Sequence, residues 1–239
     1  MTQKHNATTS SAEPLVKLPL NIPAPYSRFY NSEKWSALFD NDYFLVPLTL
    51  GACLRLPEAL ISDIPMTASV LQFGATFGPQ IEKTAYKISS FGKYVLVDNN
   101  LKQLKRCERK YQYLFPQLSF LKADATRFKS EEKFDRVICY NLLHELPPLS
   151  KVRVIDNAMK LLKPKGKAIF IDYHNPSKWN PLRYFIRMFN RLYQPFAEKL
   201  WERPIDLYAT EKVGFSWRKS TFYGGMYQKT VVTKTGMPK

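Results

Sequence analysis

The chain has 239 residues, 45% of them hydrophobic, and a formal net charge of +16. That length suffices for one α/β domain with a full core, and no apolar run is long enough for a membrane-spanning helix. The three cysteines are widely separated and contain no metal-type pair, which favours a reducing compartment. The charge favours an anionic membrane surface or nucleic acid as partner, with a merely solvated basic surface as the alternative.

The N-terminal region has a composition of its own. Residues 1–25 are polar at first and then rich in proline, without the apolar stretch of a secretory signal. We predict a disordered tail there, with transit-peptide character as the second choice. Residues 26–239 are predicted to form a single domain.

The rest of the chain alternates between two kinds of segment. Residues 44–60 indicate a helix with Pro47 in its first turn. Strands are predicted at 69–74, 94–97, 119–122, 136–140 and 167–172, with helices at 79–89, 100–113 and 150–162. Residues 163–166 should stop the last helix, and residues 217–233 should form a closing hairpin. This alternation predicts a doubly wound α/β fold, with a mainly parallel sheet and helices on both faces.

A glycine turn follows the first predicted strand and precedes a helix. Gly74 and Gly78 lie in it, where backbone can approach a ligand and helix N–H groups stay available. Asp98 ends the second strand, where a carboxylate can accept both hydroxyls of a ribose. Asp124 follows the third strand, where it can accept from an adenine amino group. Alternatively, both acids are ordinary strand-end carboxylates that face water.

Two polar clusters follow later strands, at the edge where open α/β sheets place their active sites. The first contains His144 and Glu145, and the second contains Asp172, Tyr173 and His174. Histidine can act as a base near neutral pH, so His144, Glu145, Tyr173 and His174 are the catalytic candidates. The same region could hold a divalent metal through Asp172, His174, His144 and Glu145. The alternative is that each histidine is a hydrogen-bonded structural residue.

The segment 179–201 is both aromatic and basic. On a single helix, Arg183, Arg187 and Arg191 would form a basic stripe. The opposite arc would be apolar and would hold Phe185, Ile186, Phe189, Leu192, Tyr193 and Phe196. This pattern is typical of interfacial membrane helices, of a lid over an apolar pocket, or of a helix packed on the core.

The order of glycine loop and acids resembles the class I methyltransferases over residues 69–173. Gln72 stands where that family usually has an acid, and Thr76 where it usually has its second glycine. The resemblance implies S-adenosylmethionine as cofactor, with Gly74 and Gly78 at its methionine part. The implied cofactor-binding set comprises Gln72, Gly74, Thr76, Gly78, Asp98, Asn99, Asp124, Ala125 and Tyr140.

A narrower resemblance covers most of the chain after residue 35. LLHELP, IDYHNPSKWNPLRYF, PFAEKLW and FDNDYFLVPLTLGACLRL look like segments of the rhodoquinone-biosynthesis proteins, a divergent branch of the quinone methyltransferases. That family implies replacement of a methoxy group of ubiquinone by an amino group, with S-adenosylmethionine as nitrogen donor and manganese as helper. A lipid-borne quinone in turn implies a cytoplasmic enzyme attached to the inner face of a membrane, with nucleic acid not expected as a partner.

Two other functions fit the same residues. One is a conventional methyltransferase that acts on a quinone or another small aromatic molecule. The other is a non-catalytic membrane-binding or nucleic-acid-binding protein on a degenerate methyltransferase fold, an interpretation that the net charge of +16 keeps open.

Overall fold

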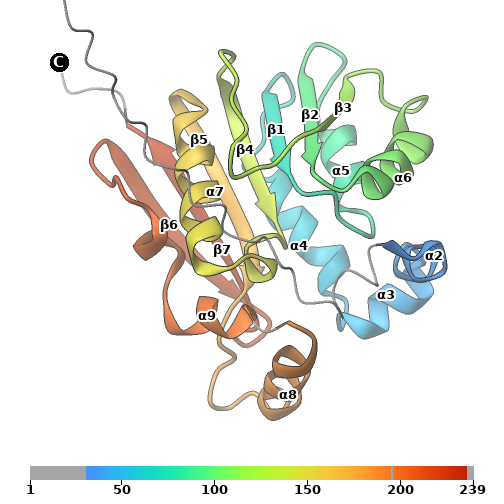
Figure 1. Cartoon of the computed structure of the whole chain (residues 1–239), viewed down its shortest axis with the longest axis vertical. Helices are drawn as coiled ribbons and strands as arrows, with labels where there is room; N and C mark the ends of the chain where they lie inside the picture. Colours follow the sequence, from blue (N-terminus) through green and yellow to red (C-terminus); the bar gives the residue numbers. More distant parts are fainter. Residues whose placement is uncertain (1–30, 195, 236–239) are drawn as a thin grey trace, which may run out of the picture.

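A computed structural model describes residues 31–194 and 196–235, so the predicted tail at 1–25 lies outside the described residues. Seven strands form one sheet in the order β3-β2-β1-β4-β5-β7-β6 (Figure 1). The strands are β1 Ser69–Phe73, β2 Lys93–Asp98, β3 Leu118–Lys122, β4 Phe134–Tyr140, β5 Leu162–Tyr173, β6 Phe215–Phe222 and β7 Tyr227–Lys234. The first five pair in parallel, and β7 pairs antiparallel with both β5 and β6. The predicted α/β class and the closing hairpin are confirmed.

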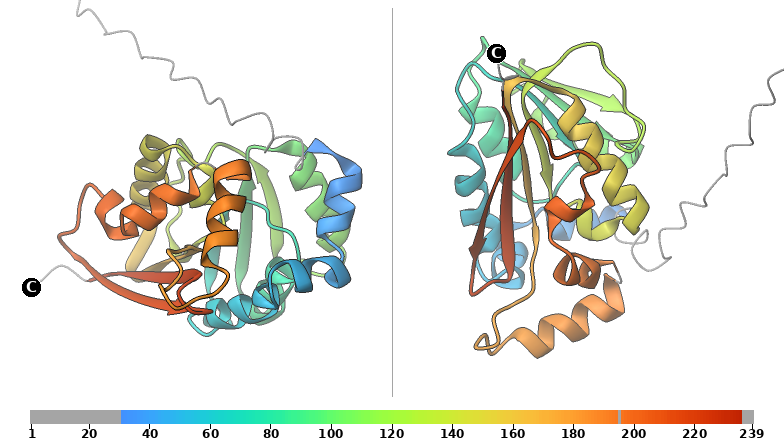
Figure 2. Two further views of the ribbon diagram at one scale, coloured as in Figure 1. Left: turned by 90° about the horizontal axis from the view of Figure 1, so that it is seen from below. Right: turned by 90° about the vertical axis from the view of Figure 1, so that its left-hand side faces the viewer.

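Helices cover both faces of the sheet. The helices are α2 Glu33–Phe39, α3 Asp42–Leu48, α4 Ala52–Ile61, α5 Gln80–Lys87, α6 Leu101–Tyr111, α7 Pro148–Lys160, α8 Arg183–Tyr193 and α9 Ala197–Glu202, with short 3-10 turns η1 Leu143–Glu145 and η2 Ile205–Tyr208. Residues of α4, α5 and α6 bury one face of the sheet, and residues of α7, α9 and η2 bury the other (Figure 2, right). Apolar side chains therefore sit on both sides of the central strands, as continuous runs such as VICY and AIFI predict.

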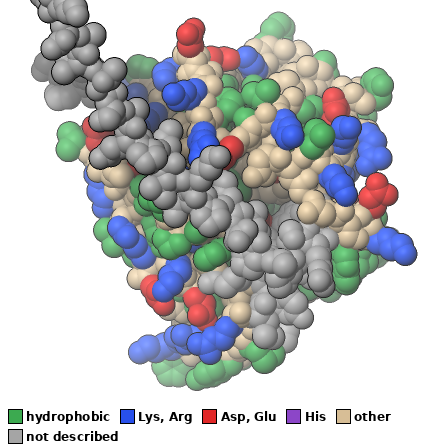
Figure 3. All heavy atoms as spheres, in the orientation of Figure 1, with side chains coloured by type: hydrophobic (Ala, Val, Ile, Leu, Met, Phe, Trp, Pro, Cys, Tyr) green, Lys and Arg blue, Asp and Glu red, His purple; other side chains and the backbone are tan. Residues whose placement is uncertain are grey.

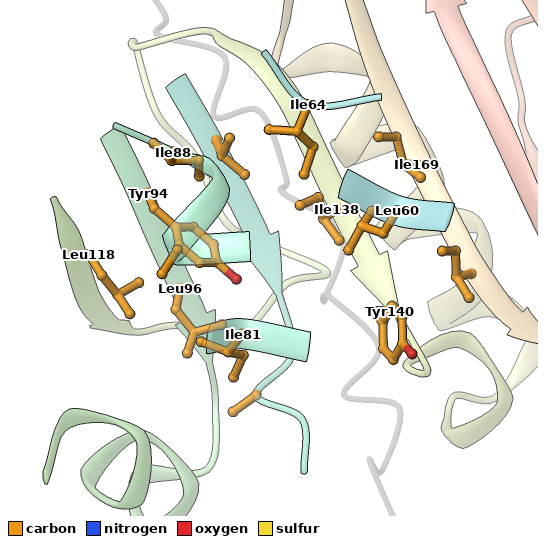
Figure 4. Packing of buried hydrophobic residues seen from close by; sticks show 14 of the residues in the cluster. Leu60, Ile64, Ile81, Ile88, Tyr94, Leu96, Leu118, Ile138, Tyr140 and Ile169 are labelled. Atoms are coloured by element: carbon orange, nitrogen blue, oxygen red, sulfur yellow. The ribbon is translucent and has the colours of Figure 1, made fainter. Parts of the chain in front are cut away.

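The core on the first face combines aliphatic side chains with buried tyrosines. Tyr94 and Leu96 of β2 lie near Ile81 of α5, while Ile138 of β4 lies near Leu60 of α4 (Figure 4). All five side chains are buried. The loops after these strands are thus held by a packed support, which matters for the site that they form.

The helix predicted at 44–60 is two helices. Leu50 and Gly51 adopt left-handed backbone angles, with φ of 52° and 77°, and separate α3 from α4. Glycine tolerates this conformation without a Cβ clash, so Gly51 is a natural point for a turn. Pro47 consequently lies in the last turn of α3, and the prediction of a first-turn proline was wrong.

The single amphipathic helix predicted over 179–201 was also wrong. It divides into α8 and α9, because Gln194 leaves the helical conformation with φ −137° at the end of α8. Phe196 belongs to the cap of α9, where its ring lies 5.7 Å from Nζ of Lys151. The structure describes the backbone of Phe185, Phe189, Leu192 and Tyr193 but not their side chains, so the predicted apolar arc of these four residues stays a prediction.

The last parallel strand begins earlier than expected. Residues 163–166 were predicted to be a turn, yet β5 starts at Leu162 opposite Phe134 of β4. The register then shifts, with Lys165 at φ 62°, before regular pairing resumes at Lys167. Such a bulge lets the chain bend while it stays beside its neighbour strand.

Candidate functional site

One cavity opens at the carboxyl ends of β1, β2 and β4. Most of the predicted cofactor-binding residues line it, namely Gly74, Asp98, Asn99, Asp124, Ala125 and Tyr140. Asn141, Leu142 and Glu145, in the segment that follows β4, complete the side opposite Asp98. Residues far apart in the sequence meet here because parallel strands deliver their following loops to the same edge of the sheet.

The two acids are held in different ways. Both oxygens of Asp98 accept backbone N–H groups, from Ala75 and from Asn100, each at 2.7 Å. Burial raises the pKa of Asp98 despite these donors. Oδ1 of Asp124 accepts from the N–H and the hydroxyl of Thr126, both at 2.8 Å. Asp98 is therefore fixed by the glycine loop and by the turn that follows β2, whereas Asp124 is fixed by its own turn.

The two glycines of the loop have different tasks. Gly74 has φ 90°, and a Cβ there would meet the side chain of Leu142 at 3.3 Å, so Gly74 allows close approach beside the cavity. Gly78 has φ 76°, and a Cβ there would lie 2.5 Å from Leu45 of α3. Within the described part of the chain, the cavity lining does not include Gly78. Gly78 therefore allows α3 to pack closely on the loop, and its placement at the methionine part of a cofactor stays a prediction.

Gln72 and Thr76 were also predicted at the cofactor, and the structure places both in a hydrogen-bond network that contacts the glycine loop. The amides of Gln72 and Gln80 bond reciprocally at 2.9 Å. Thr76 donates its hydroxyl to Gln80 at 2.9 Å, and the hydroxyl of Tyr94 donates to Gln72. Gln72 also donates to the Gly74 carbonyl at 3.0 Å. An uncharged network therefore anchors the loop at the position where the class I family usually has an acid.

Sequence reasoning missed a clamp on the outer side of the same loop. Arg106 of α6 pairs with Asp40 at the end of α2 and donates to the Thr76 carbonyl at 2.7 Å. Its guanidinium also lies 4.5 Å from the centre of the Phe77 ring. The clamp joins α2, α6 and the glycine loop. No local pattern reveals it, because Asp40 and Arg106 are 66 residues apart.

A buried histidine–aspartate pair lies behind the cavity. Nδ1 of His144 is 2.8 Å from Asp172, whose carboxylate also accepts the backbone N–H groups of Leu143, His144 and Tyr173. Burial lowers the pKa of His144, but the Asp172 carboxylate outweighs it, so the pKa is raised overall. Nε2 of His144 lies 3.9 Å from Glu145, the member of this group that lines the cavity.

Tyr173 and His174 have separate surroundings. The Tyr173 ring lies 4.5 Å from His144 and 5.4 Å from Tyr227, and burial raises its pKa to about 12. His174 turns to the β6–β7 hairpin, where its Nδ1 is 2.9 Å from the Gly225 carbonyl and its N–H donates to Met226. His174 is therefore hydrogen-bonded to the hairpin that leads into β7, the antiparallel neighbour of β5.

This placement overturns the predicted metal set of Asp172, His174, His144 and Glu145. Among residues 31–194 and 196–235, no group of three or more His, Cys, Asp or Glu side chains is arranged to hold a metal ion. Asp172 is also saturated by hydrogen-bond donors. The predicted convergence of both histidines on one cleft was therefore wrong for His174.

Asn141 is a second residue that sequence reasoning left without a role. It lies directly after β4 with φ 49°. Asn141 lines the cavity, and its buried side-chain Oδ1 has no hydrogen-bond partner within the described part of the chain. Buried polar atoms are nearly always paired, so an orphan beside a cavity points to a ligand donor. The available sequence signal was an asparagine directly after a predicted strand, because asparagine tolerates the left-handed conformation.

The comparisons with known proteins agree with this geometry. The methyltransferase domain family matches residues 70–166. The N-methyltransferase NodS from Bradyrhizobium japonicum WM9 is similar with a TM-score of 0.56 at 17% identity, over 80% of this chain and 98% of that one. An O-methyltransferase family protein from Burkholderia thailandensis is similar with a TM-score of 0.66 at 15% identity, over 89% of this chain and 63% of that one.

The mitomycin 7-O-methyltransferase MmcR gives a TM-score of 0.65 at 14% identity, over 90% of this chain and 62% of that one. No curated protein matches the sequence. One conclusion follows from the strand order, from the family match over the central strands and from the position of the cavity. The chain has the class I methyltransferase fold, and its residues 70–166 match the methyltransferase domain.

Proposed function

We propose that the protein is an S-adenosylmethionine-dependent transferase that acts on a lipophilic quinone. The observation that carries the cofactor part is the cavity that brings Gly74, Asp98 and Asp124 together from three successive loops. A solved structure of NodS with S-adenosylhomocysteine, similar at a TM-score of 0.56 and 16% identity, supports this choice. When bound, S-adenosylmethionine supplies the activated group that is transferred.

The residues present fit such a cofactor. Asp98 is oriented by two backbone donors and retains lone pairs that can accept ribose hydroxyls. Asp124 uses Oδ1 within its own turn, which leaves Oδ2 for an adenine amino group. The unpaired Oδ1 of Asn141 offers an acceptor near Gly74. A donor-rich ligand therefore meets three acceptors already held in place.

Glu145 is the catalytic candidate in this proposal. It lines the cavity, and His144 lies between it and Asp172. Methyl transfer to a quinol hydroxyl would release the proton of that hydroxyl, and the Glu145 carboxylate is placed to accept it. His144 acts as a positioning residue that is oriented by Asp172. The proposal assigns no metal ligand, because His174 lies apart from the other three predicted residues, at the β6–β7 hairpin.

Two transferred groups are compatible with this site. The rhodoquinone resemblance favours exchange of a quinone methoxy group for an amino group. The methyltransferase domain match over residues 70–166 favours ordinary methyl transfer. Mass spectrometry of quinones from cells with and without the protein tests both, since the first reaction yields an aminoquinone and the second a methylated quinone.

Isothermal titration of the purified protein tests the cofactor part separately. We expect saturable binding of S-adenosylmethionine. If titration detects none and the quinone profile does not change, the interpretation as a non-catalytic binding protein replaces this proposal.

A further inference from the structure

The outer face of α8 combines cations with exposed apolar groups. Tyr184, Arg187, Met188 and Arg191 follow helical spacing on one side, and together with Glu198 they border a surface groove. Tyr184 is 81% exposed and Met188 is 56% exposed. Asn190, on the opposite side, is buried. Part of the sequence-predicted arginine stripe is therefore presented outward together with apolar side chains.

A second apolar strip lies on α3 and the corner that follows it. Tyr43 is 94% exposed, and Leu48 and Leu50 are about half exposed. No single helix in the described ranges is long and apolar enough to cross a membrane. The pair α3 and α4 would be long and apolar enough together, but the two helices meet at an 88° bend. Because α4 packs on the sheet, α3 and its corner remain as the outward part of that apolar sequence.

The β6–β7 hairpin turn joins these two strips. The hydroxyl of Tyr223 donates to the carbonyl of Gly51, at the α3–α4 corner, at 3.2 Å. The carbonyl of the same tyrosine accepts from the Asn180 side chain at 3.4 Å. Trp179, beside Asn180 and leading to α8, is 94% exposed. Exposed apolar side chains thus run from the α3–α4 corner through Trp179 to α8.

This surface lies at the carboxyl end of the parallel strands, where the cavity opens. The view from below shows α8 and α3 on the same face of the molecule (Figure 2, left). In the space-filling view, Lys and Arg side chains adjoin hydrophobic ones along the lower edge (Figure 3). We name the set Tyr43, Leu48, Leu50, Trp179, Tyr184, Arg187, Met188 and Arg191 the carboxyl-end surface.

We propose that the carboxyl-end surface docks on an anionic lipid bilayer. Arginines beside exposed tryptophan, tyrosine and aliphatic side chains match the layering of a bilayer interface, with phosphates above an acyl boundary. Exposed leucine and methionine have no counterpart in binding a phosphate backbone, which needs cations and hydrogen-bond donors. Docking in this orientation turns the cavity end toward the lipid that would carry the proposed substrate, and lipid binding itself requires neither cofactor nor substrate.

Vesicle sedimentation of the full chain tests this surface without any reference to the transferred group. The double variant Arg187→Gln with Arg191→Gln should bind vesicles of phosphatidylcholine and phosphatidylglycerol roughly thirtyfold more weakly at low salt, since each cation near such a surface contributes about fivefold. The matched control, Lys133→Gln with Lys165→Gln, removes the same charge beside the opposite ends of β4 and β5 and should bind like the parent.

A second pair of variants tests the apolar part. Leu50→Ala with Trp179→Ala should weaken binding roughly tenfold, including at moderate salt, because lost apolar contact is not screened. Phe91→Ala with Tyr113→Ala, two side chains that are each 89% exposed near the opposite edge, is the control. Equal sedimentation of parent and surface variants would overturn the proposal. So would tighter binding to a single-stranded RNA oligonucleotide that is lost in the same arginine variant.

Discussion

The ends of β2 and β5 each carry an acid, yet the two acids have different surroundings. Asp98 lines the cavity, whereas Asp172 is fully buried and holds His144. The segments that follow the neighbouring strands explain the difference. The loop after β1 leaves Asp98 at the cavity, whereas the turn η1 after β4 places the Leu143 and His144 N–H groups and the His144 ring against Asp172. A strand-end acid is therefore a ligand candidate only where the next segment does not enclose it.

Removal of the buried acid should have the largest effect. Asp172→Ala leaves the His144 ring and three backbone N–H groups without their acceptor. We expect a loss of about 3–5 kcal/mol in the free energy of unfolding, because several buried donors lose one shared partner. Urea denaturation measures it. The control His174→Ala removes one hydrogen bond to Gly225 and should cost about 1 kcal/mol; equal losses would break the contrast between the two clusters.

Removal of the cavity acid should act on affinity. Asp98→Ala removes acceptors for two ribose hydroxyls and should weaken S-adenosylmethionine binding by about 2–4 kcal/mol. Isothermal titration measures the change, with Asp135→Ala as a control, because Asp135 lies at the start of β4 and pairs with Lys163 and Ser69. Unchanged affinity in Asp98→Ala would remove this residue from the cofactor site.

The two histidines should give stability profiles of opposite sign, the smallest effect of the three. Burial lowers the pKa of His144, but the Asp172 carboxylate outweighs it and raises the folded-state pKa above the ordinary value of 6.5. Its contribution is therefore complete below about that pH and is lost as pH rises through the folded pKa. Burial lowers the pKa of His174. The His174 side chain therefore lowers the free energy of unfolding as pH falls from 6.5 through its folded-state pKa. Unfolding free energies of His144→Gln and His174→Gln between mildly acidic and neutral pH separate the slopes, and slopes of the same sign would contradict the assignment.

Sequence patterns predicted the sheet well because short buried strands and amphipathic helices have distinct periods. The breaks in helices were harder. Gly51 divides α3 from α4 through a left-handed backbone angle, which glycine permits but does not require. Gln194 ends α8 directly before Pro195, a local signal that the prediction of a single helix did not use.

The candidate site was predictable where topology alone sets position. Asp98 and Asp124 follow parallel strands, so their meeting could be inferred. Gly78 and His174 could not be placed, because their partners, Leu45 and Gly225, come from the N-terminal helices and the closing hairpin. The Arg106–Asp40 clamp depends likewise on how α2 docks on α6.

The network of Gln72, Gln80 and Thr76 has a consequence for how the protein responds to acidity. Its two amides and one hydroxyl carry no proton that titrates between acidic and alkaline conditions, and burial raises the pKa of its tyrosine, Tyr94, far above the ordinary range. Acidification therefore leaves the hydrogen bonds of this network unchanged, whereas Asp98, which accepts the Ala75 N–H of the same loop and has a raised pKa, can be protonated. A pH-dependent loss of ligand affinity would report on such a carboxylate and not on the network.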